Sequence, residues 1–382
     1  MTMELHGDRP TQAWIDLAAL RANAAEARRL ASGRDVIAVV KADGYGHGMV
    51  PVASALLEAG CARLAVLTVA EAAELREAAV AAPILVLGGV HDAREAERAV
   101  ALRLIPVLHG EDGLHLLAAA ARRAATRARV HVEVDSAMHR MGVPLEAAVR
   151  FLAQVADESA LELEGVFTHL ACADEADPAP SLEQLRRFRA VLEEAARAGL
   201  RPPVVHAANS AGLLAGKTLA EALPEATAVR PGLMLYGVRP ARHQDEESRL
   251  RPVMTLRTEV VQLHELAAGE RVGYGGTFRA ERPTRVATLA LGYADGVPWT
   301  AANRGEVWLA GARRPVVGRV SMDYTGVEVG DAPVGIGAEA IVFGRGSDGG
   351  ISVEDAAERA GTLHYELLVR VGGRVPRRYI GV

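Results

Sequence analysis

The sequence predicts an α/β protein with an N-terminal (β/α)8 barrel of the TIM type and a C-terminal, mostly β domain. At 382 residues the chain is longer than one ordinary domain. Short β-branched runs alternate with alanine-rich amphipathic stretches through roughly the first 235 residues, which is typical of parallel strands joined by helices. After about residue 245, strand-like segments and glycine-rich turns replace this alternation. We therefore expect one domain at residues 1–245 and a second at residues 246–382.

Eight strand-like runs are expected in the first domain, and this number favours a closed barrel over an open doubly wound sheet. Segments such as PVASALLEAG and SLEQLRRFRAVLEEAARAGL separate the runs and have apolar residues at helical spacing. The fourth run is short. The expected strands cover residues 36–40, 63–68, 83–88, 105–109, 129–135, 163–169, 204–208 and 228–235.

The second domain is expected to consist mainly of strands. Glycine-rich turns separate the segments MTLRTEVVQLHEL, TRVATLALGYADG, GEVWLAG, RRPVVGRVSMDYTGVEVG and AEAIVFGRG. Only residues 352–361 and the stretch after them are expected to be helical.

Composition and charge exclude several classes of protein. The net charge of −5 and the pI near 6.2 give no basic surface for nucleic acid. The chain has no uninterrupted apolar stretch of about 18 residues, and MTMELHGDRP lacks the apolar core of a signal peptide. We therefore expect a cytoplasmic protein with no membrane partner. Cys61 and Cys172 have neither metal-ligand spacing nor a disulfide framework, so no metal site is expected.

The stretch VVKADGYGHG places Lys41 at the end of the first expected strand. Only two of the 43 cationic residues are lysines, and the other is Lys217. Arginine forms ion pairs but does not lose its proton to become a nucleophilic amine, whereas lysine can. The pattern indicates that Lys41 is kept for its chemistry. A chance survivor of a drift towards arginine explains the same composition, and this observation alone leaves both interpretations open.

Polar residues gather at the carboxyl ends of the expected barrel strands, where the active sites of such barrels lie. Each of them taken alone fits a structural role, but their shared position favours one functional site. The set comprises Lys41, Arg140, His169, Asn209, Ser210 and Arg230.

The loops after the seventh and eighth strands of such barrels often bind phosphate. Here they contain Asn209-Ser210 and Arg230-Pro231-Gly232-Leu233. A hydroxyl group and backbone N–H groups near a glycine suit phosphate oxygens. A lysine on the first strand, across the barrel mouth from a phosphate site, suggests pyridoxal 5′-phosphate, whose aldehyde condenses with an amine.

Seven motifs of the chain resemble those of the alanine racemase family. They are VVKADGYGHG, THLACADE, HAANSAG, VRPGLMLYG, GYGGTF, GYADG and SMDYTGV. They occur in the family's order and extend along nearly the whole chain. The resemblance implies a pyridoxal-phosphate-dependent isomerase that interconverts L-alanine and D-alanine, with cell-wall D-alanine supply as the family's usual task.

By this resemblance, Lys41 would hold the cofactor and act as the base on one face of the substrate, and Tyr274 of a second subunit would act on the other. Racemisation removes the Cα proton from one face and returns a proton to the other, so two acid–base groups must flank the carbon. Tyrosine, with an ordinary pKa of roughly 10, needs a neighbour that stabilises its phenolate. The resemblance assigns that role to His169, with His206 in the surrounding network. It also implies a head-to-tail homodimer.

The resemblance places Arg230 at the pyridine nitrogen of the cofactor, where many related enzymes have a carboxylate. Arginine stays charged and does not give up its proton, so the nitrogen would remain unprotonated. The ring would then withdraw electrons less strongly, which limits reprotonation at the wrong carbon and hence transamination. This choice favours racemisation over decarboxylation.

Other positions match binding residues of the family. The cofactor-binding set comprises Tyr45, Asn209, Ser210, Gly232, Leu233 and Tyr365, in addition to Lys41, His169, His206 and Arg230. Arg140 and the backbone at Met322 match contacts to the substrate carboxylate. Asp174, Tyr293 and Arg319 match residues of the entrance corridor.

Some residues depart from the family's pattern. Glu133 stands where many members have a carbamylated lysine, and we expect its carboxylate to orient Arg140 without modification. Ser136-Ala137 replace the common Thr-Gly, and Ser321 replaces a common cysteine. Trp299 stands where an arginine is usual near the entrance, and loss of that cation could broaden substrate choice.

Two alternatives stay open. A racemase of serine or of a larger amino acid would share every catalytic residue. A non-catalytic, cofactor-binding regulatory protein would lack the second domain and Tyr274. A decarboxylase of related architecture is disfavoured, because it would want a catalytic cysteine in the second domain and both cysteines precede residue 240.

Overall fold

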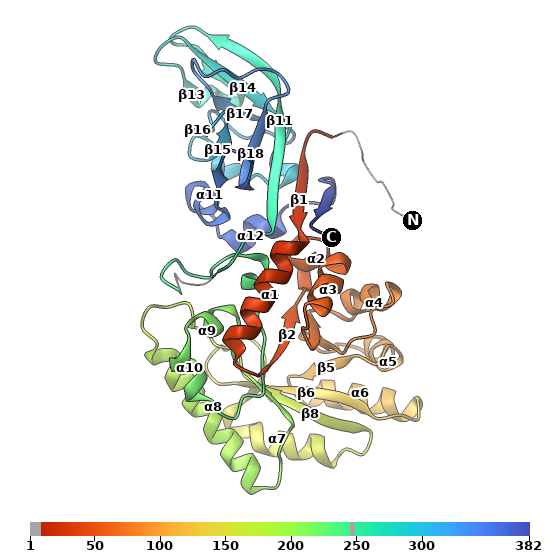
Figure 1. Ribbon diagram of the computed structural model, residues 1–382. Helices are drawn as coiled ribbons and strands as arrows, with labels where there is room; N and C mark the ends of the chain where they lie inside the picture. The colour runs from red at the N-terminus through yellow and green to blue at the C-terminus, as the bar shows by residue number, and fades with distance from the viewer. Residues whose placement is uncertain (1–8, 245–248) are drawn as a thin grey trace. The chain divides into compact units, whose positions relative to one another are not determined.

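The structure is a computed structural model that describes residues 9–244 and 249–382. These residues form two compact units (Figure 1). Residues 21–44 and 49–250, apart from 245–248, form the first, which we call the barrel unit. Residues 9–20, 45–48 and 251–382 form the second, which we call the β unit.

The barrel unit is a closed ring of eight parallel strands, which confirms the predicted architecture. The ring closes because β10 pairs with β2 and β9, while β5 pairs with β6. Most of the strand residues are buried, and the β-branched side chains fill the space inside and around the ring. The strands are β2 (Asp35–Val39), β3 (Arg63–Val66), β4 (Ile84–Val86), β5 (Ile105–Leu108), β6 (Ala128–Asp135), β8 (Leu161–Phe167), β9 (Val204–His206) and β10 (Ala228–Val229), with β7 (Val143–Pro144) beside β6.

Each expected run overlaps one strand of the ring, but the eighth run is strand only at its start. β10 ends at Val229, and the chain then forms a turn and the 3-10 helix η1 (Leu233–Tyr236). Pro231 has no N–H to donate to a strand ladder, so it suits this early end. The loop after the last strand therefore lies at the carboxyl edge of the barrel.

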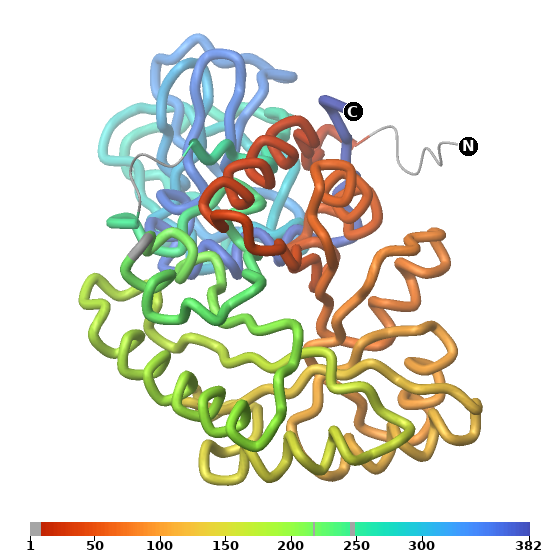
Figure 2. The backbone as a smooth tube through the Cα atoms, turned by 60° about the horizontal axis from the view of Figure 1, so that its bottom comes forward, coloured from red at the N-terminus to blue at the C-terminus, as the bar shows by residue number. Residues whose placement is uncertain are grey.

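Helices surround the ring of strands (Figure 2). Side chains fix several of their starts. Thr68 and Glu71 form a reciprocal capping box at α4, and Asp92 caps α5. The helices are α1 (Leu17–Ala31), α2 (Lys41–Tyr45), α3 (Met49–Glu58), α4 (Val69–Glu77), α5 (Ala93–Ala101), α6 (Glu111–Arg123), α7 (Leu145–Asp157), α8 (Ala179–Arg197), α9 (Ser210–Leu214) and α10 (Lys217–Ala222).

The β unit is built on the long strand β11 (Met254–Leu266), which pairs with β1, β14 and β18. The two expected helical stretches are α11 (Val353–Ala360) and α12 (His364–Val369). The remaining strands are β1 (Gln12–Asp16), β12 (Arg271–Val272), β13 (Phe278–Arg279), β14 (Thr284–Leu289), β15 (Glu306–Leu309), β16 (Ala312–Pro315), β17 (Thr325–Glu328), β18 (Glu339–Arg345), β19 (Gly350–Ile351) and β20 (Arg377–Ile380).

The prediction for residues 1–245 differs from the structure at the N-terminal side. β1 lies in the sheet of the β unit, antiparallel to β11 and parallel to β20, with Trp14 opposite Thr255 and Arg378. The Arg257 guanidinium also lies 4.4 Å above the Trp14 ring. β1 alternates buried and half-buried residues, as a strand with one solvated face does. No local pattern in the sequence indicates this short strand.

No helix within the described ranges combines the length and the apolar character that crossing a bilayer requires.

Candidate functional site

One pocket of about 510 Å³ lies at the carboxyl ends of the barrel strands. Its walls include the segments that follow β2, β3, β4, β6, β8 and β10. Five residues singled out in the sequence line it together: Lys41, Glu133, Arg140, His169 and Arg230. The barrel topology therefore gathers residues that are up to 189 positions apart in the chain (230 − 41).

Lys41 lies two residues after the end of β2 and begins a left-handed turn. Ala42, Asp43 and Gly44 have φ values of 54°, 54° and 60°, which non-glycine residues rarely adopt. Side chains hold this turn, because Asp43 accepts from the Met49 N–H at 2.8 Å and Glu71 accepts from the Ala42 N–H at 2.7 Å. The turn thus fixes the backbone next to the lysine.

The surroundings of Lys41 favour its neutral amine. Burial lowers the pKa of Lys41, and the positive charges of Arg140 and Arg230 lower it further, whereas Glu71 opposes the shift. A lysine with a lowered pKa is a better nucleophile and base near neutral pH. The chemical role expected for Lys41 stays a prediction.

Arg230 binds two histidines. Its Nη2 lies 2.9 Å from Nδ1 of His169, and its Nη1 lies 2.5 Å from Nδ1 of His206. The guanidinium also lies 4.5 Å from the centre of the Phe167 ring. Burial, followed by the charges of Arg230, Arg140 and Lys41, lowers the pKa of His169 to about 3. His169 is therefore neutral, with Nδ1 as the acceptor.

Ser210 joins the loops after β9 and β10. Its Oγ accepts from the N–H groups of Gly232 at 2.9 Å and Met234 at 3.2 Å, so its hydroxyl hydrogen can be donated to another group. Asn209 caps α9, with its side chain accepting from the Gly212 N–H at 2.9 Å. Leu233 begins η1 next to Gly232. The expected phosphate-binding loops therefore do lie together.

Glu133 is buried beside His109. The two side chains approach to 3.2 Å between Oε2 and Nδ1, and His109 Nε2 lies 3.0 Å from the Leu87 carbonyl. Arg140 lines the same pocket and is exposed. The expected orientation of Arg140 by Glu133 stays a prediction, whereas the histidine partner was not foreseen.

Ser136 and Asp174 differ in their surroundings. The Ser136 hydroxyl lies 2.5 Å from that of Thr168, which donates to the Val134 carbonyl at 2.8 Å. Ser136 thereby connects the ends of β6 and β8. Asp174, a predicted corridor residue, is exposed and does not line the pocket.

The β unit exposes a second group of predicted residues. Tyr274, Trp299 and Met322 are 72%, 54% and 52% exposed, respectively, which is unusual for large side chains. Tyr274 starts a glycine-rich 3-10 turn, η2 (Tyr274–Gly276), between β12 and β13. Arg319 lies against this turn and 5.9 Å from the Trp299 ring. We call this group of exposed residues the tyrosine face.

Tyr293 is joined to the loop of Met322 through backbone hydrogen bonds. Its N–H donates to the Ser321 carbonyl at 3.0 Å, and the Ala294 N–H donates to the Met322 carbonyl at 3.1 Å. A Cβ at Gly292 would clash with the Ser321 carbonyl oxygen, so only glycine permits this approach. The turn η3 (Tyr293–Asp295) and the Met322 loop are thus joined. Tyr45 and Tyr365 also belong to the β unit, where Tyr365 packs against His364 with ring centres 4.9 Å apart.

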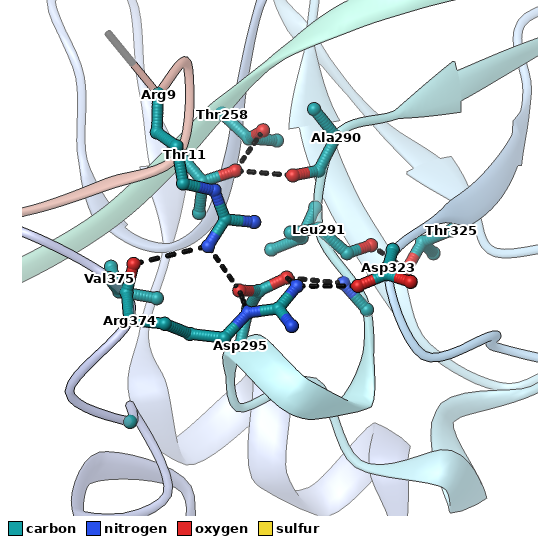
Figure 3. Close-up of polar contacts among 12 residues, drawn as sticks. Arg9, Thr11, Thr258, Ala290, Leu291, Asp295, Asp323, Thr325, Arg374 and Val375 are labelled. Carbon is teal, nitrogen blue, oxygen red and sulfur yellow. Dashed lines mark hydrogen bonds and ion pairs between the residues drawn. The ribbon is translucent and has the colours of Figure 1, made fainter. Parts of the chain in front are cut away.

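A buried carboxylate fixes these two loops (Figure 3). Asp295 is fully buried and accepts from Arg9 and Arg374, each at 2.7 Å, while the Gly292 N–H binds its second oxygen at 3.0 Å. Arg374 also binds Asp323 at 2.6 Å, next to Met322. Sequence reasoning missed this cluster. Asp295 lies in the quoted motif GYADG, but nothing in the sequence links it to an arginine 79 residues away.

Comparison with known proteins covers both units. Residues 15–240 match the family model described as "Alanine racemase, N-terminal domain", and residues 253–379 match "Alanine racemase, C-terminal domain". The chain is similar to curated alanine racemases of Halothermothrix orenii, with 39% identity over 97% of both chains, and Symbiobacterium thermophilum, with 42% identity over 99% of both. It is similar in structure to alanine racemase from D-cycloserine-producing Streptomyces lavendulae, with TM-score 0.93 and 36% identity over 99% and 98% of the two chains. It is also similar to the biosynthetic alanine racemase of Pseudomonas aeruginosa, with TM-score 0.87 and 38% identity over 98% and 100%.

Proposed function

Because the chain belongs to the alanine racemase family, we propose that it interconverts L-alanine and D-alanine with pyridoxal 5′-phosphate as its cofactor. The observation that carries the proposal is that Lys41 and Arg230 line one pocket at the carboxyl ends of the barrel strands. Lysine supplies an amine with a lowered pKa, and arginine supplies a permanent cation. Together they can hold an aldehyde and a ring nitrogen, respectively.

The residues present fit this cofactor. The Lys41 amine suits its aldehyde, the Arg230 guanidinium suits its ring nitrogen, and the Ser210 hydroxyl with the loop at Gly232 and Leu233 suits its phosphate. The cofactor, when bound, supplies an electron sink for the pair of electrons left at Cα. Asn209, Tyr45, His206 and Tyr365 complete the proposed cofactor-binding set.

Lys41 and Tyr274 are the proposed acid–base pair. Neutral Lys41 removes the Cα proton on one face, and the Tyr274 hydroxyl of a partner subunit delivers a proton to the other face. Because Arg230 occupies Nδ1 of His169, the hydrogen of this neutral ring lies on Nε2 and can be donated to the Tyr274 phenolate. Arg140 and the Met322 backbone bind the substrate carboxylate.

The exposure of Tyr274 supports a homodimer. A tyrosine that is 72% exposed at the tip of a turn is available to a second copy of the chain. In a head-to-tail dimer, the tyrosine face of one subunit would complete the pocket of the other. Such an enzyme would work in the cytoplasm, and its D-alanine would supply peptidoglycan.

Serine is the second candidate substrate. Trp299 lies near Arg319 on the tyrosine face. By the resemblance, an arginine is usual at the position of Trp299. Asp174, Tyr293 and Arg319 remain the proposed corridor residues. One added hydroxyl in a pocket that does not bind it changes selectivity by only roughly 1–3 kcal/mol.

Solvent exchange tests the proposed function. The purified protein with pyridoxal 5′-phosphate is incubated in deuterium oxide with L-alanine or L-serine, and proton NMR and a chiral assay follow the Cα proton and the enantiomer. We expect exchange with inversion for alanine and a slower reaction for serine. Tyr274→Phe should lower the rate by about 10²–10⁴-fold. Cofactor absorbance without exchange of either amino acid would instead identify a non-catalytic binding protein.

A further inference from the structure

Two buried side chains of the barrel unit, Glu164 and His131, have no part in the chemistry proposed above. Glu164 lies on β8 and His131 on β6, and they are 6% and 1% exposed. A buried ionisable side chain costs free energy unless partners compensate it. The partners of these two residues therefore indicate what they do.

Glu164 is the anionic end of a chain of contacts. Its Oε1 accepts from Arg63 at 2.7 Å and from Arg129 at 3.3 Å. Its Oε2 lies 3.5 Å from Nε2 of His131, at the outer limit of a hydrogen bond. Neither of these two buried atoms has a hydrogen-bond partner among the described residues, so each has the other as its near polar neighbour. The carboxylate thus faces two cations on one side and an imidazole on the other.

The chain continues from His131 to Arg230. Nδ1 of His131 lies 3.0 Å from Nε2 of His206, and Nδ1 of His206 lies 2.5 Å from Nη1 of Arg230. Arg230 in turn reaches His169 in the pocket. A continuous row of side chains therefore connects a buried carboxylate to the guanidinium proposed for the cofactor's ring nitrogen.

The two ends of this row determine where each imidazole hydrogen lies. Arg230 can only donate, so Nδ1 of His206 accepts and its Nε2 carries the hydrogen. That N–H points to Nδ1 of His131, whose own hydrogen then lies on Nε2 and faces the Glu164 carboxylate. Burial lowers the pKa of both histidines, which favours the neutral rings that this pattern requires. Every contact then has one donor and one acceptor.

Neighbouring residues on β8 make room for this row and fix it. A Cβ at Gly165 would lie 2.5 Å from the His131 ring, so a larger residue would displace the imidazole. The Phe167 ring stacks on His206, with centres 4.5 Å apart and planes 13° apart, and the same ring also supports Arg230. β8 therefore supplies the carboxylate, the space and the stacking surface.

We propose that Glu164 and His131 are positioning residues that fix the tautomer of His206 and thereby the position of Arg230 at the cofactor's ring nitrogen. The proposal rests on the proposed function for its effect on catalysis, but its structural part concerns the protein alone. At neutral pH the Glu164 carboxylate can only accept hydrogen bonds, so each N–H along the row points towards Glu164. Glutamine at this position can also donate, which permits the reverse direction.

Reversal would place an N–H of His206 against Arg230. In Glu164→Gln, donation from the new side-chain amide to Nε2 of His131 would move the His131 hydrogen to Nδ1, and the His206 hydrogen would follow to Nδ1. Two donors would then meet at 2.5 Å in the present geometry, which forces the guanidinium away. A purely structural role for Glu164 would not alter the His206 tautomer.

The test is ¹⁵N NMR of histidine-labelled holoenzyme, with the two ring nitrogens of His206 as the readout. We expect the Nε2–H tautomer alone in the original protein and a mixture of tautomers in Glu164→Gln. In Glu164→Gln, kcat should fall about tenfold with KM for alanine changed less than about twofold, because Arg230 contacts the cofactor and not the substrate. The absorption spectrum of the bound cofactor should shift as well.

Glu162→Gln is the matched control, because Glu162 lies on the same strand and is exposed. It should leave the tautomer, the spectrum and kcat unchanged. An unchanged His206 tautomer in folded Glu164→Gln would overturn the proposal. If that variant does not fold, His131→Gln interrupts the row one residue later, and a His206 tautomer unchanged there would also overturn it.

Failure of the proposed function can be told apart from failure of this inference. A protein that binds no cofactor and exchanges no substrate proton would refute the proposed function. The same NMR readout would still report the His206 tautomer, which depends on Glu164, His131 and Arg230 alone.

Discussion

Glu164 in the barrel unit and Asp295 in the β unit are both buried carboxylates that bind arginines, but their remaining contacts differ. Each binds two arginines that partly offset the cost of its burial. The second oxygen of Glu164 faces an imidazole, and side-chain contacts continue to Arg230. The second oxygen of Asp295 instead accepts a backbone N–H, and its arginine reaches a second carboxylate beside Met322.

The two clusters therefore differ in what they hold in place. The row that starts at Glu164 controls hydrogen positions on other side chains, so its effect should be chemical. The cluster around Asp295 fastens the backbones of two loops, so its effect should be on stability and on loop position. Variants that remove one charge without changing size can separate the two.

The largest expected effect is that of Asp295→Asn on stability. Removing this charge leaves Arg9 and Arg374 around a buried amide, and breaking a buried ion pair costs roughly 3–5 kcal/mol. Because both arginines are partly exposed, we expect a loss of about 2–3 kcal/mol in the free energy of unfolding. Urea unfolding measures it. Asp323→Asn, at a half-exposed carboxylate, is the control and should cost less than about 1 kcal/mol, and equal losses would contradict the difference in burial.

The second effect is the acid sensitivity that Glu164 gives to the fold. Burial raises the pKa of Glu164, but His131 and Arg63 outweigh it and lower the pKa to about 2. A carboxyl group whose pKa is lowered on folding contributes stability above its unfolded pKa of roughly 4.3 and loses it as the pH falls towards the folded value. We therefore expect Glu164→Gln to remove roughly 2 kcal/mol of the stability change between about pH 5 and pH 2.

Unfolding free energies measured across that range check this prediction. Glu162→Gln should keep the full pH dependence, since Glu162 is exposed on the same strand. Parallel curves for the original protein and Glu164→Gln would show that another carboxylate carries the acid sensitivity.

A smaller effect is expected at Glu133, a third buried carboxylate. Its partner is His109 rather than an arginine, and it lines the pocket with Arg140. If Glu133 orients Arg140 for the substrate carboxylate, Glu133→Gln should raise KM for alanine severalfold, with little change in kcat. Steady-state kinetics measure both constants. An unchanged KM would count against this role. Glu95→Gln removes another carboxylate of the same pocket, and its KM for alanine provides the comparison.

The smallest effect is expected at the tyrosine face. Trp299→Arg places a cation beside Arg319 and should lower the rate with serine relative to alanine by less than about tenfold. The ratio of kcat/KM for the two amino acids reports it. Stability should stay unchanged because Trp299 is exposed; a ratio equal to that of the original protein would remove Trp299 from the account of substrate choice.

The sequence predicts those parts of the fold and site that leave a local signal. β-branched runs mark the barrel strands, and lysine scarcity marks Lys41. β1 was missed because a five-residue strand with alternating burial resembles a loop until its partners β11 and β20 are placed beside it.

The two carboxylate clusters could not be predicted from local patterns. Glu164 stands in an otherwise strand-like run, and only the barrel closure brings it to His131, 33 residues earlier on a neighbouring strand (164 − 131). Asp295 and Arg374 meet across 79 residues, and Arg9 comes from the opposite end of the chain. Such contacts form only when distant segments of the chain meet in the fold, so no local stretch of the sequence indicates them.

Subunit mixing tests directly whether Lys41 and Tyr274 act at one site across two subunits. Lys41→Ala and Tyr274→Phe proteins are each nearly inactive by this account, and they are unfolded together, refolded and assayed for alanine racemisation. Half of the resulting dimers would be mixed, and each mixed dimer would have one intact site, so about one quarter of the original activity should return. If both residues came from the same subunit, no mixed dimer would contain an intact site. If correctly refolded dimers regained no activity, a site shared between two subunits would therefore be contradicted.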